Sequence, residues 1–317
     1  MKRMLKMHET SIILLLLIYI AIVGIINPSF VQFNSLSLIM KSSVILVVLA
    51  IGQSFVLFTK NIDVSVGSIM GLSAAVCGML LTNGYNAFLS IFAAVMLGAS
   101  IGFINGIGVA KFRVLAIIMT LGMLGIVRGA MLIFTGGKWI EDIPNNFKKL
   151  SSIVILGLPI TVWGILIVLL LLYFFLRKVP YGRYFYAVGD NEDGARLIGI
   201  PVNQVKINAF IVSGISAAIA GCIFVMNIGF VPNQTGTGIE LQVIAAAVLG
   251  GIHLKGGTGS IFGAALGALF LEVISSSLIF LKIPAFWNNA ISGFLLLLII
   301  ILDSVMKKWK AERRMNL

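Results

Sequence analysis

The chain has 317 residues, of which 59% are hydrophobic and 11% are charged, and this composition excludes a disordered protein. Its roughly 187 apolar residues correspond to about nine bilayer spans of ~20 residues, and the glycine and serine residues within them raise the expectation to ten. The net charge of +12 is the balance of 23 basic and 11 acidic residues. The basic residues lie between the apolar runs, which indicates membrane orientation and not binding of nucleic acid.

The N-terminus begins with a basic stretch that precedes the apolar run 12–26. No small-residue cleavage site follows this run, so we predict an uncleaved first span and not a signal peptide. The remaining spans are predicted at about 42–59, 65–82, 87–110, 115–134, 159–177, 207–228, 241–252, 259–281 and 286–302. The segment 241–252 is too short to cross a bilayer, so we expect a broken or re-entrant helix there.

The distribution of basic residues predicts the orientation. With the N-terminus inside, 17 of the Lys and Arg residues in loops lie on the cytoplasmic side and 5 lie outside, while Arg128 falls within a span. Cytoplasmic loops of membrane proteins carry such an excess. We therefore predict one transmembrane domain over 1–317 in the cytoplasmic membrane, surrounded by lipid, with both termini inside. It has an outer loop at about 135–158 and an inner segment at about 179–206.

Small residues recur at every fourth position in three predicted spans. Such faces let helices approach closely in lipid, so they predict a tightly packed bundle. The stripes are Ala94, Gly98, Gly102 and Gly106; Gly67, Gly71, Ala75 and Gly78; and Gly259, Gly263 and Gly267.

The sequence also suggests an internal repeat. The helix, polar loop and helix around Asp63 match those around Glu240, which would form an inverted repeat. A second similarity, between 67–71 and 259–263, sets a different register, and the sequence leaves both open.

Residues for enzyme chemistry are scarce. His8 and His253 stand far apart, and Cys77 and Cys222 lie in apolar runs, so they support neither a metal site nor a disulfide framework. A serine hydrolase would lack its base, and there is no Gly-x4-Gly-Lys-[Ser/Thr] nucleotide loop. We therefore predict a protein that is not an enzyme and holds no metal or cofactor. If transport uses ATP, a separate subunit supplies it.

Four ionisable residues lie at membrane depth, where a charge is costly and usually functional: Asp63, Arg128, Glu240 and Glu272. Asp63 either caps the next helix or takes part in gating, and the sequence leaves both readings open. Arg128 is expected to extend to the outer surface, and Glu272 to form an interhelical contact. The candidate pathway and gating residues are Asn61, Asp63, Ser65, Ser68, Asn233, Gln234, Thr235 and Glu240.

The inner segment contains a predicted short helix outside the membrane. Asp190 or Asn191 is its expected N-cap, two acidic residues occupy its first turn, and Gly199 ends it ahead of Pro201. A plain connector needs neither these caps nor the aromatic residues at 181–186. We therefore interpret this segment as an interaction element.

Two stretches resemble the permease subunits of ribose-type ABC importers: Asp63-Val-Ser-Val-Gly-Ser68 and the segment 182–199. The stretches 135–141 with Pro144, and 228–238, resemble more narrowly the autoinducer-2 permeases of this family. The resemblance covers nearly the whole chain, and it fails at His253 and Lys255, where the family carries a smaller or apolar residue.

The resemblance implies a bacterial type II ABC importer and its partners. These are a sister permease in a heterodimer, two ATP-binding subunits inside and an extracytoplasmic solute-binding protein. It also implies that the segment 182–199 couples the permease to the ATPase. The implied coupling residues are Asp190, Asn191, Gly194, Ala195, Arg196 and Gly199.

The prediction is thus an all-α, polytopic permease of about ten spans that moves a small polyhydroxylated solute inward. The resemblance makes autoinducer-2 the first candidate for that solute. One alternative is a ribose-type sugar permease. Another is a secondary carrier or channel without an ATPase, although the few carboxylates at membrane depth count against ion coupling.

Overall fold

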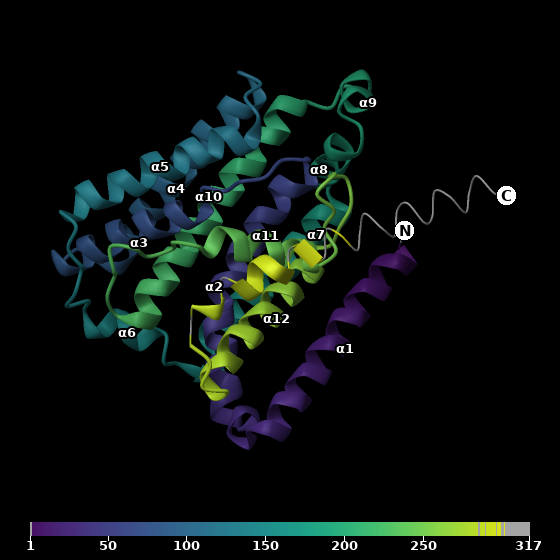
Figure 1. The fold of residues 1–317 in the computed structure, drawn as a ribbon. Coiled ribbons are helices and arrows are strands. Elements are labelled where there is room, and N and C mark those ends of the chain that lie inside the picture. Colours follow the sequence, from purple (N-terminus) through teal and green to yellow (C-terminus); the bar gives the residue numbers. More distant parts are fainter. Residues whose placement is uncertain (1, 285, 289, 296, 299–300, 302–317) are drawn as a thin grey trace.

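A computed structural model describes residues 2–301 of the chain, except 285, 289, 296, 299 and 300. Within these residues the protein is a bundle of helices (Figure 1). The helices are α1 (Lys2–Ile26), α2 (Phe33–Phe58), α3 (Val66–Thr82), α4 (Ala87–Ala110), α5 (Ala116–Thr135), α6 (Asn145–Leu150), α7 (Ile160–Lys178), α8 (Pro180–Asp190), α9 (Glu192–Leu197), α10 (Val202–Ile228), α11 (Ile239–Leu249) and α12 (Ile261–Phe280), with a 3-10 turn, η1 (Pro28–Val31).

Seven of the described helices are long and apolar enough to cross a bilayer: α1, α2, α4, α5, α7, α10 and α12. The helices α3 and α11 are shorter and also apolar. Together they correspond to the first nine predicted spans. The helices α2 and α10 begin at Phe33 and Val202, ahead of the predicted 42 and 207, because they continue through polar residues that interrupt the apolar run. The tenth predicted span, 286–302, includes residues outside the described ones.

The predicted outer loop holds α6 and a small hairpin of β1 (Val154–Ile155) and β2 (Leu158–Pro159). The turn residues Leu156 and Gly157 have φ of 50° and 80°, as a two-residue hairpin turn requires. This hairpin and an isolated antiparallel bridge between Ile140 and Val231 are the departures from a purely helical fold in the described part of the chain. The turn signal of the hairpin is a single glycine, which the apolar runs on both sides conceal.

Helix α10 lies at the centre of the bundle and contacts α2, α3 and α4. The predicted stripe on α4 faces it, because a Cβ added at Gly98 would collide with the carbonyl of Gly214, and one at Gly102 with that of Phe210. The paired residue numbers change in opposite directions, so α4 and α10 run antiparallel with their backbones in contact. The close packing predicted for this stripe is therefore confirmed.

The other two stripes have different partners. On α12, Gly263 and Gly267 face the backbone of Gly250 and Ala246 at the end of α11. On α3, the glycine stripe faces mainly an irregular loop, 229–238, together with the start of α11. Helix α1 lies along α12 apart from the rest of the bundle (Figure 1).

The contacts between helices fit the first of the two repeat registers. Exchanging α2, α3 and α4 with α10, α11 and α12 turns the α10–α4 contact into α2–α12, the α10–α3 contact into α2–α11, and the α3–α4 contact into α11–α12. All of these pairs are in contact, and α2 also contacts α10 directly. This exchange matches Asp63 with Glu240, as the inverted repeat requires.

Candidate functional site

The loop 59–65 connects α2 to α3 and buries Asp63 completely. Asp63 Oδ1 accepts hydrogen bonds from Ser65 N (2.9 Å) and Ser65 Oγ (2.6 Å), and its Oδ2 accepts one from Ser213 Oγ of α10 (2.8 Å). Ser65 Oγ accepts from Asn105 Nδ2 of α4 (2.9 Å). With its amide oriented to satisfy both groups, Gln53 of α2 donates to Asp63 O (3.1 Å) and accepts from Asp63 N (3.2 Å). The Asp63 network therefore joins α2, α4 and α10 to the start of α3.

The N-cap reading, one of the two that the sequence left open for this stretch, is not borne out. An N-cap side chain accepts from amides in the first turn of its helix, and Ser65, the residue before α3, makes no such bond. Asp63 instead bonds to Ser65 and to a side chain 150 residues away in the sequence. Its structural role is to connect helices, which a cap does not do.

The polar loop 229–238 runs along α3 toward the interior of the bundle. Three loop positions meet three glycines of α3: Val231 with Gly78, Thr235 with Gly71, and Gly236 with Gly67. Eleven residues separate the first and last of these glycines, or about three helical turns. Helix α11 begins where this loop ends. The segment 241–252 is thus part of a short helix that follows an irregular loop, as a broken or re-entrant helix would be.

Arg128 of α5 supports this loop, which corrects the prediction that it extends to the outer surface. Its Nη1 donates to Thr235 O at 2.7 Å. A loop backbone that enters a membrane protein must find partners for its carbonyl groups inside the protein. The guanidinium supplies one partner, so Arg128 is held by this internal bond.

Glu240 lies in the first turn of α11, and its two carboxylate oxygens differ in their surroundings. Oε1 accepts from Gly238 N at 3.3 Å. Oε2 is buried and has no hydrogen-bond partner in the described structure. A Cβ added at Gly67 would lie 2.6 Å from Oε2, so this oxygen sits against the first turn of α3. It is an acceptor with unused capacity.

The structure brings only part of the candidate pathway set together. Thr235 and Glu240 meet the first turns of α3, which carry the buried Ser68. Asn233 Nδ2 instead donates to Gly137 O in the outer loop (2.8 Å), and Gln234 is exposed. Asn61 lies at the end of α2, where its Nδ2 donates to Thr59 O (2.8 Å). No group of three or more His, Cys, Asp or Glu residues that could hold a metal occurs in the described part of the chain.

The predicted short helix in the inner segment is α9. Asn191 is its N-cap, because its Oδ1 accepts from Gly194 N at 2.9 Å, whereas Asp190 ends the preceding helix α8. Ala195 of α9 is buried. Gly199 has a φ of 81° just beyond the helix, a conformation that glycine adopts without strain. The predicted helix and its stop are confirmed.

The aromatic residues at 181–186 are part of α8 and face α2. The ring centroids of Phe185 and Phe55 are 5.1 Å apart, and those of Tyr186 and Phe58 are 4.4 Å apart. Phe185 and Tyr186 therefore anchor the inner segment to α2. The exposed apolar residues are Leu197 and Ile198 at the end of α9, which are 88% and 76% exposed.

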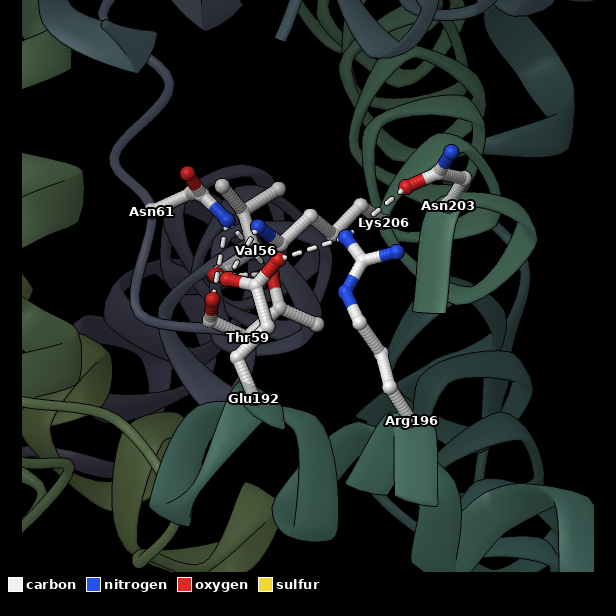
Figure 2. A network of polar contacts seen from close by, with 7 residues as sticks. All are labelled: Val56, Thr59, Asn61, Glu192, Arg196, Asn203 and Lys206. Atoms are coloured by element: carbon white, nitrogen blue, oxygen red, sulfur yellow. Dashed lines mark hydrogen bonds and ion pairs between the residues drawn. The ribbon is translucent and has the colours of Figure 1, made fainter. Parts of the chain in front are cut away.

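Figure 2 shows Glu192 of α9 between Arg196 and Lys206. Arg196 Nη2 lies 2.9 Å from Glu192 Oε1, and Lys206 Nζ of α10 lies 2.7 Å from Oε2. Arg196 also donates to Asn203 Oδ1 at 3.3 Å. Partial burial raises the pKa of Glu192, but the hydrogen bonds from Lys206 and Arg196 outweigh this and hold the pKa below its ordinary value. The Glu192 network therefore fixes α9 to the first turn of α10.

Several residues of these networks were missed by sequence reasoning. Gln53, Asn105 and Ser213 are single polar residues within apolar helices, and Lys206 is one cation among many. A buried amide in an otherwise apolar span is a usable signal, because it must find a partner there. That signal does not identify the partner.

Comparisons with known proteins agree with this architecture. A family model described as branched-chain amino acid transport system / permease component matches residues 35–300. Three relatives bear the name autoinducer 2 import system permease protein LsrC. That of Photorhabdus luminescens is 46% identical over 296 residues, 93% of this chain and 89% of the relative. That of Enterobacter sp. (strain 638) is 46% identical over 308 residues, 97% and 90% of the two chains.

The third relative, from Escherichia coli (strain K12 / DH10B), is 45% identical over 296 residues, which cover 93% of this chain and 86% of the relative. No solved structure matches the chain. A family match over residues 35–300 and this level of identity along nearly the whole chain settle the relationship. The chain belongs to the branched-chain amino acid transport system / permease component family, as a multi-pass, non-catalytic permease subunit of a bacterial ABC importer.

Proposed function

We propose that this permease carries autoinducer 2 into the cytoplasm, driven by ATP hydrolysis on separate subunits. The observation that carries the proposal is the 45–46% identity, along 93–97% of the chain, to permeases named for autoinducer 2 import. Glu240, whose Oε2 makes no hydrogen bond within the described chain, is the candidate acceptor for a hydroxyl group of this solute.

The proposed assembly pairs the chain with a sister permease, two ATP-binding subunits and an extracytoplasmic binding protein. The 17 to 5 distribution of basic residues supports a cytoplasmic position of both termini in this proposal. The helices α9 and α6 contact opposite ends of α10 (Figure 1), so α9 would face the ATPase and the outer loop the binding protein. Trp139 of that loop is 55% exposed and stacks on Phe230, which makes it a rigid contact residue.

The described contacts suggest how the ATPase would act on the pathway. Glu192 binds Lys206 at the start of α10, and Ser213 of α10 binds Asp63. A displacement of α9 would therefore reach the loop 59–65 and the start of α3, which the pathway loop 229–238 contacts. In this proposal Asn61, Asp63, Ser65 and Ser68 pass the displacement of α10 on to α3 as one connected unit, and Asn233, Gln234, Thr235 and Glu240 line the outer side of the path.

Uptake by a strain that lacks only this permease tests the substrate. The strain is complemented with the wild-type chain or with Glu240→Gln, and uptake of autoinducer 2 and ribose is measured side by side. We expect uptake of autoinducer 2 and not of ribose, and a reduced rate with Glu240→Gln at an unchanged membrane level. Uptake of ribose alone would assign the chain to sugar import. Uptake that persists with a hydrolysis-deficient ATPase would instead indicate a secondary carrier.

Arg196→Glu tests the coupling role of α9. It places a third acid beside Glu192 and Asp193, so it should reduce ATPase stimulation by the loaded binding protein in reconstituted vesicles while the membrane level stays normal. Full stimulation would exclude a coupling role for this side chain.

Two further experiments test the orientation and the outer partner. Reporter fusions at Leu317 and within 140–150 test the orientation. Crosslinking from Trp139→Cys should capture the binding protein.

A further inference from the structure

A cavity of about 580 Å³ opens where the end of α7, the helix α8 and the start of α12 meet. Its lining includes three cations, Arg177, Lys178 and Arg183, together with residues 257–261. The candidate pathway residues are not among its lining residues. The cavity is therefore separate from the proposed transport route.

The three cations are not neutralised by ion pairs within the described chain. Both ion pairs found there involve Glu192. The guanidinium carbon of Arg177 lies 4.4 Å from the ring centroid of Tyr173, a contact that orients the group and keeps its charge. Glu9, which accepts a hydrogen bond from Ser260 Oγ (2.6 Å), lies nearby but does not line the cavity. The cavity thus presents excess positive charge to a ligand.

Neutral donors complete the lining. Ile261 begins the 20-residue helix α12, so the positive end of its dipole lies at this wall. Burial raises the pKa of the Tyr186 phenol, and the nearby Arg177 offsets this only in part, so Tyr186 keeps its proton at neutral pH. Arginines, a lysine and a phenol together suit an anion with several acceptor oxygens, such as a phosphate group.

The surface next to the cavity is apolar. On α7, the residues Leu170, Leu171 and Phe174 are 50%, 63% and 55% exposed, and Phe174 also lines the cavity. Acyl chains can lie on this helix face while a phosphate occupies the cationic cavity at its end. A free phosphate would use the cavity alone, so the adjoining apolar face favours a lipid.

We propose that this cavity binds the phosphate headgroup of an anionic phospholipid. Its assignment to the cytoplasmic leaflet rests on the orientation given under the proposed function, whereas the binding site itself does not. A lipid in this position would join α7 and α8 to the start of α12. It would therefore stabilise the base of the inner segment that leads into α9.

The test uses the purified full chain in a neutral detergent, with phosphatidylglycerol, phosphatidylcholine and inorganic phosphate as the ligands. Native mass spectrometry measures lipid binding, and the thermal unfolding midpoint measures stabilisation. The variant Arg177→Gln/Lys178→Gln/Arg183→Gln removes the cavity cations. The control Lys138→Gln/Lys148→Gln/Lys149→Gln removes three cations from the outer loop, so both variants have the same net charge.

We expect phosphatidylglycerol, and not phosphatidylcholine, to bind the wild type and the control and to raise their unfolding midpoints. The cavity variant should bind it about 100-fold more weakly, at about fivefold for each cation removed. A normal midpoint in phosphatidylcholine shows that this variant folds. Equal binding by the cavity variant, equal binding of phosphatidylcholine, or the full midpoint rise with inorganic phosphate alone would each overturn the proposal. None of these measurements depends on autoinducer 2, so their failure would leave the transport function untouched.

Discussion

Asp63 and Glu192 each connect separate helices through a carboxylate, but in opposite surroundings. Asp63 is fully buried and accepts three hydrogen bonds, whereas the Glu192 side chain is 40% exposed and accepts from two cations. Water can replace a partner lost at the surface, and it cannot do so in the interior. The Asp63 network is therefore expected to fix the bundle, and the Glu192 network to hold a docking helix in place while allowing it to adjust.

Removing the buried carboxylate should have the largest effect on stability. Asp63→Ala leaves Ser65 N, Ser65 Oγ and Ser213 Oγ without their acceptor, and each unsatisfied buried donor costs about 1–3 kcal/mol. We expect a loss of about 3 kcal/mol or more in unfolding free energy. Thermal unfolding in detergent and the membrane level of the variant measure it.

Asp63→Asn is the matched control, because the amide keeps one oxygen for the Ser65 bonds and turns an NH2 group to Ser213. It should cost about 1 kcal/mol and leave uptake near normal. A normal membrane level with uptake abolished would show that the charge serves gating. Wild-type stability of Asp63→Ala would contradict the scaffold role.

The same contrast between buried and open surroundings applies to glycines. Gly102→Ala places a methyl group on the carbonyl of Phe210 in α10, whereas Gly122→Ala on α5 meets no atom within 4 Å. Forcing atoms into a packed contact costs about 1–3 kcal/mol. We expect that loss for Gly102→Ala and no loss for Gly122→Ala in detergent unfolding. Equal behaviour of the two variants would show that the α4–α10 contact can relax.

The separation of interacting residues along the sequence explains which features could be predicted from it and which could not. Apolar runs predicted the spans, because each run is a local property of about 20 residues. The capped helix α9 was predicted for the same reason, since Asn191, Glu192 and Gly199 lie close together in the sequence. The Asp63 network was not, because Gln53, Asn105 and Ser213 come from three different helices. Arg128 was wrongly expected to extend to the outer surface, because its partner Thr235 is 107 residues away and offers only a backbone carbonyl.

Neutralising the exposed carboxylate should have a smaller, pH-dependent effect. Glu192→Gln removes two surface ion pairs, which contribute up to about 1 kcal/mol. Because the folded pKa of Glu192 lies below its ordinary value of 4.5, its contribution to stability is present above that value and is lost as the pH falls through the folded pKa. We expect the wild type to unfold at a higher temperature than the variant at pH 7, with the difference shrinking below pH ~4.5 and in high salt. A pH-independent difference would show that the ion pairs are not its source.

Replacing the exposed apolar residues of α9 should have the smallest effect on the stability of the permease and the largest effect on its coupling to the ATPase. Leu197 and Ile198 are 88% and 76% exposed, so replacing both with serine should change the unfolding free energy by no more than about 0.5 kcal/mol. If α9 docks on the ATPase, these are the apolar side chains that the partner would bury, at about 1.5 kcal/mol or more each. Co-purification of the ATPase and its stimulation by loaded binding protein should then fall about tenfold or more. Leu156→Ser is the control, because Leu156 is 87% exposed on the outer hairpin and should leave both quantities unchanged. Full stimulation with both serines in place would mean that the ATPase binds elsewhere on the inner surface.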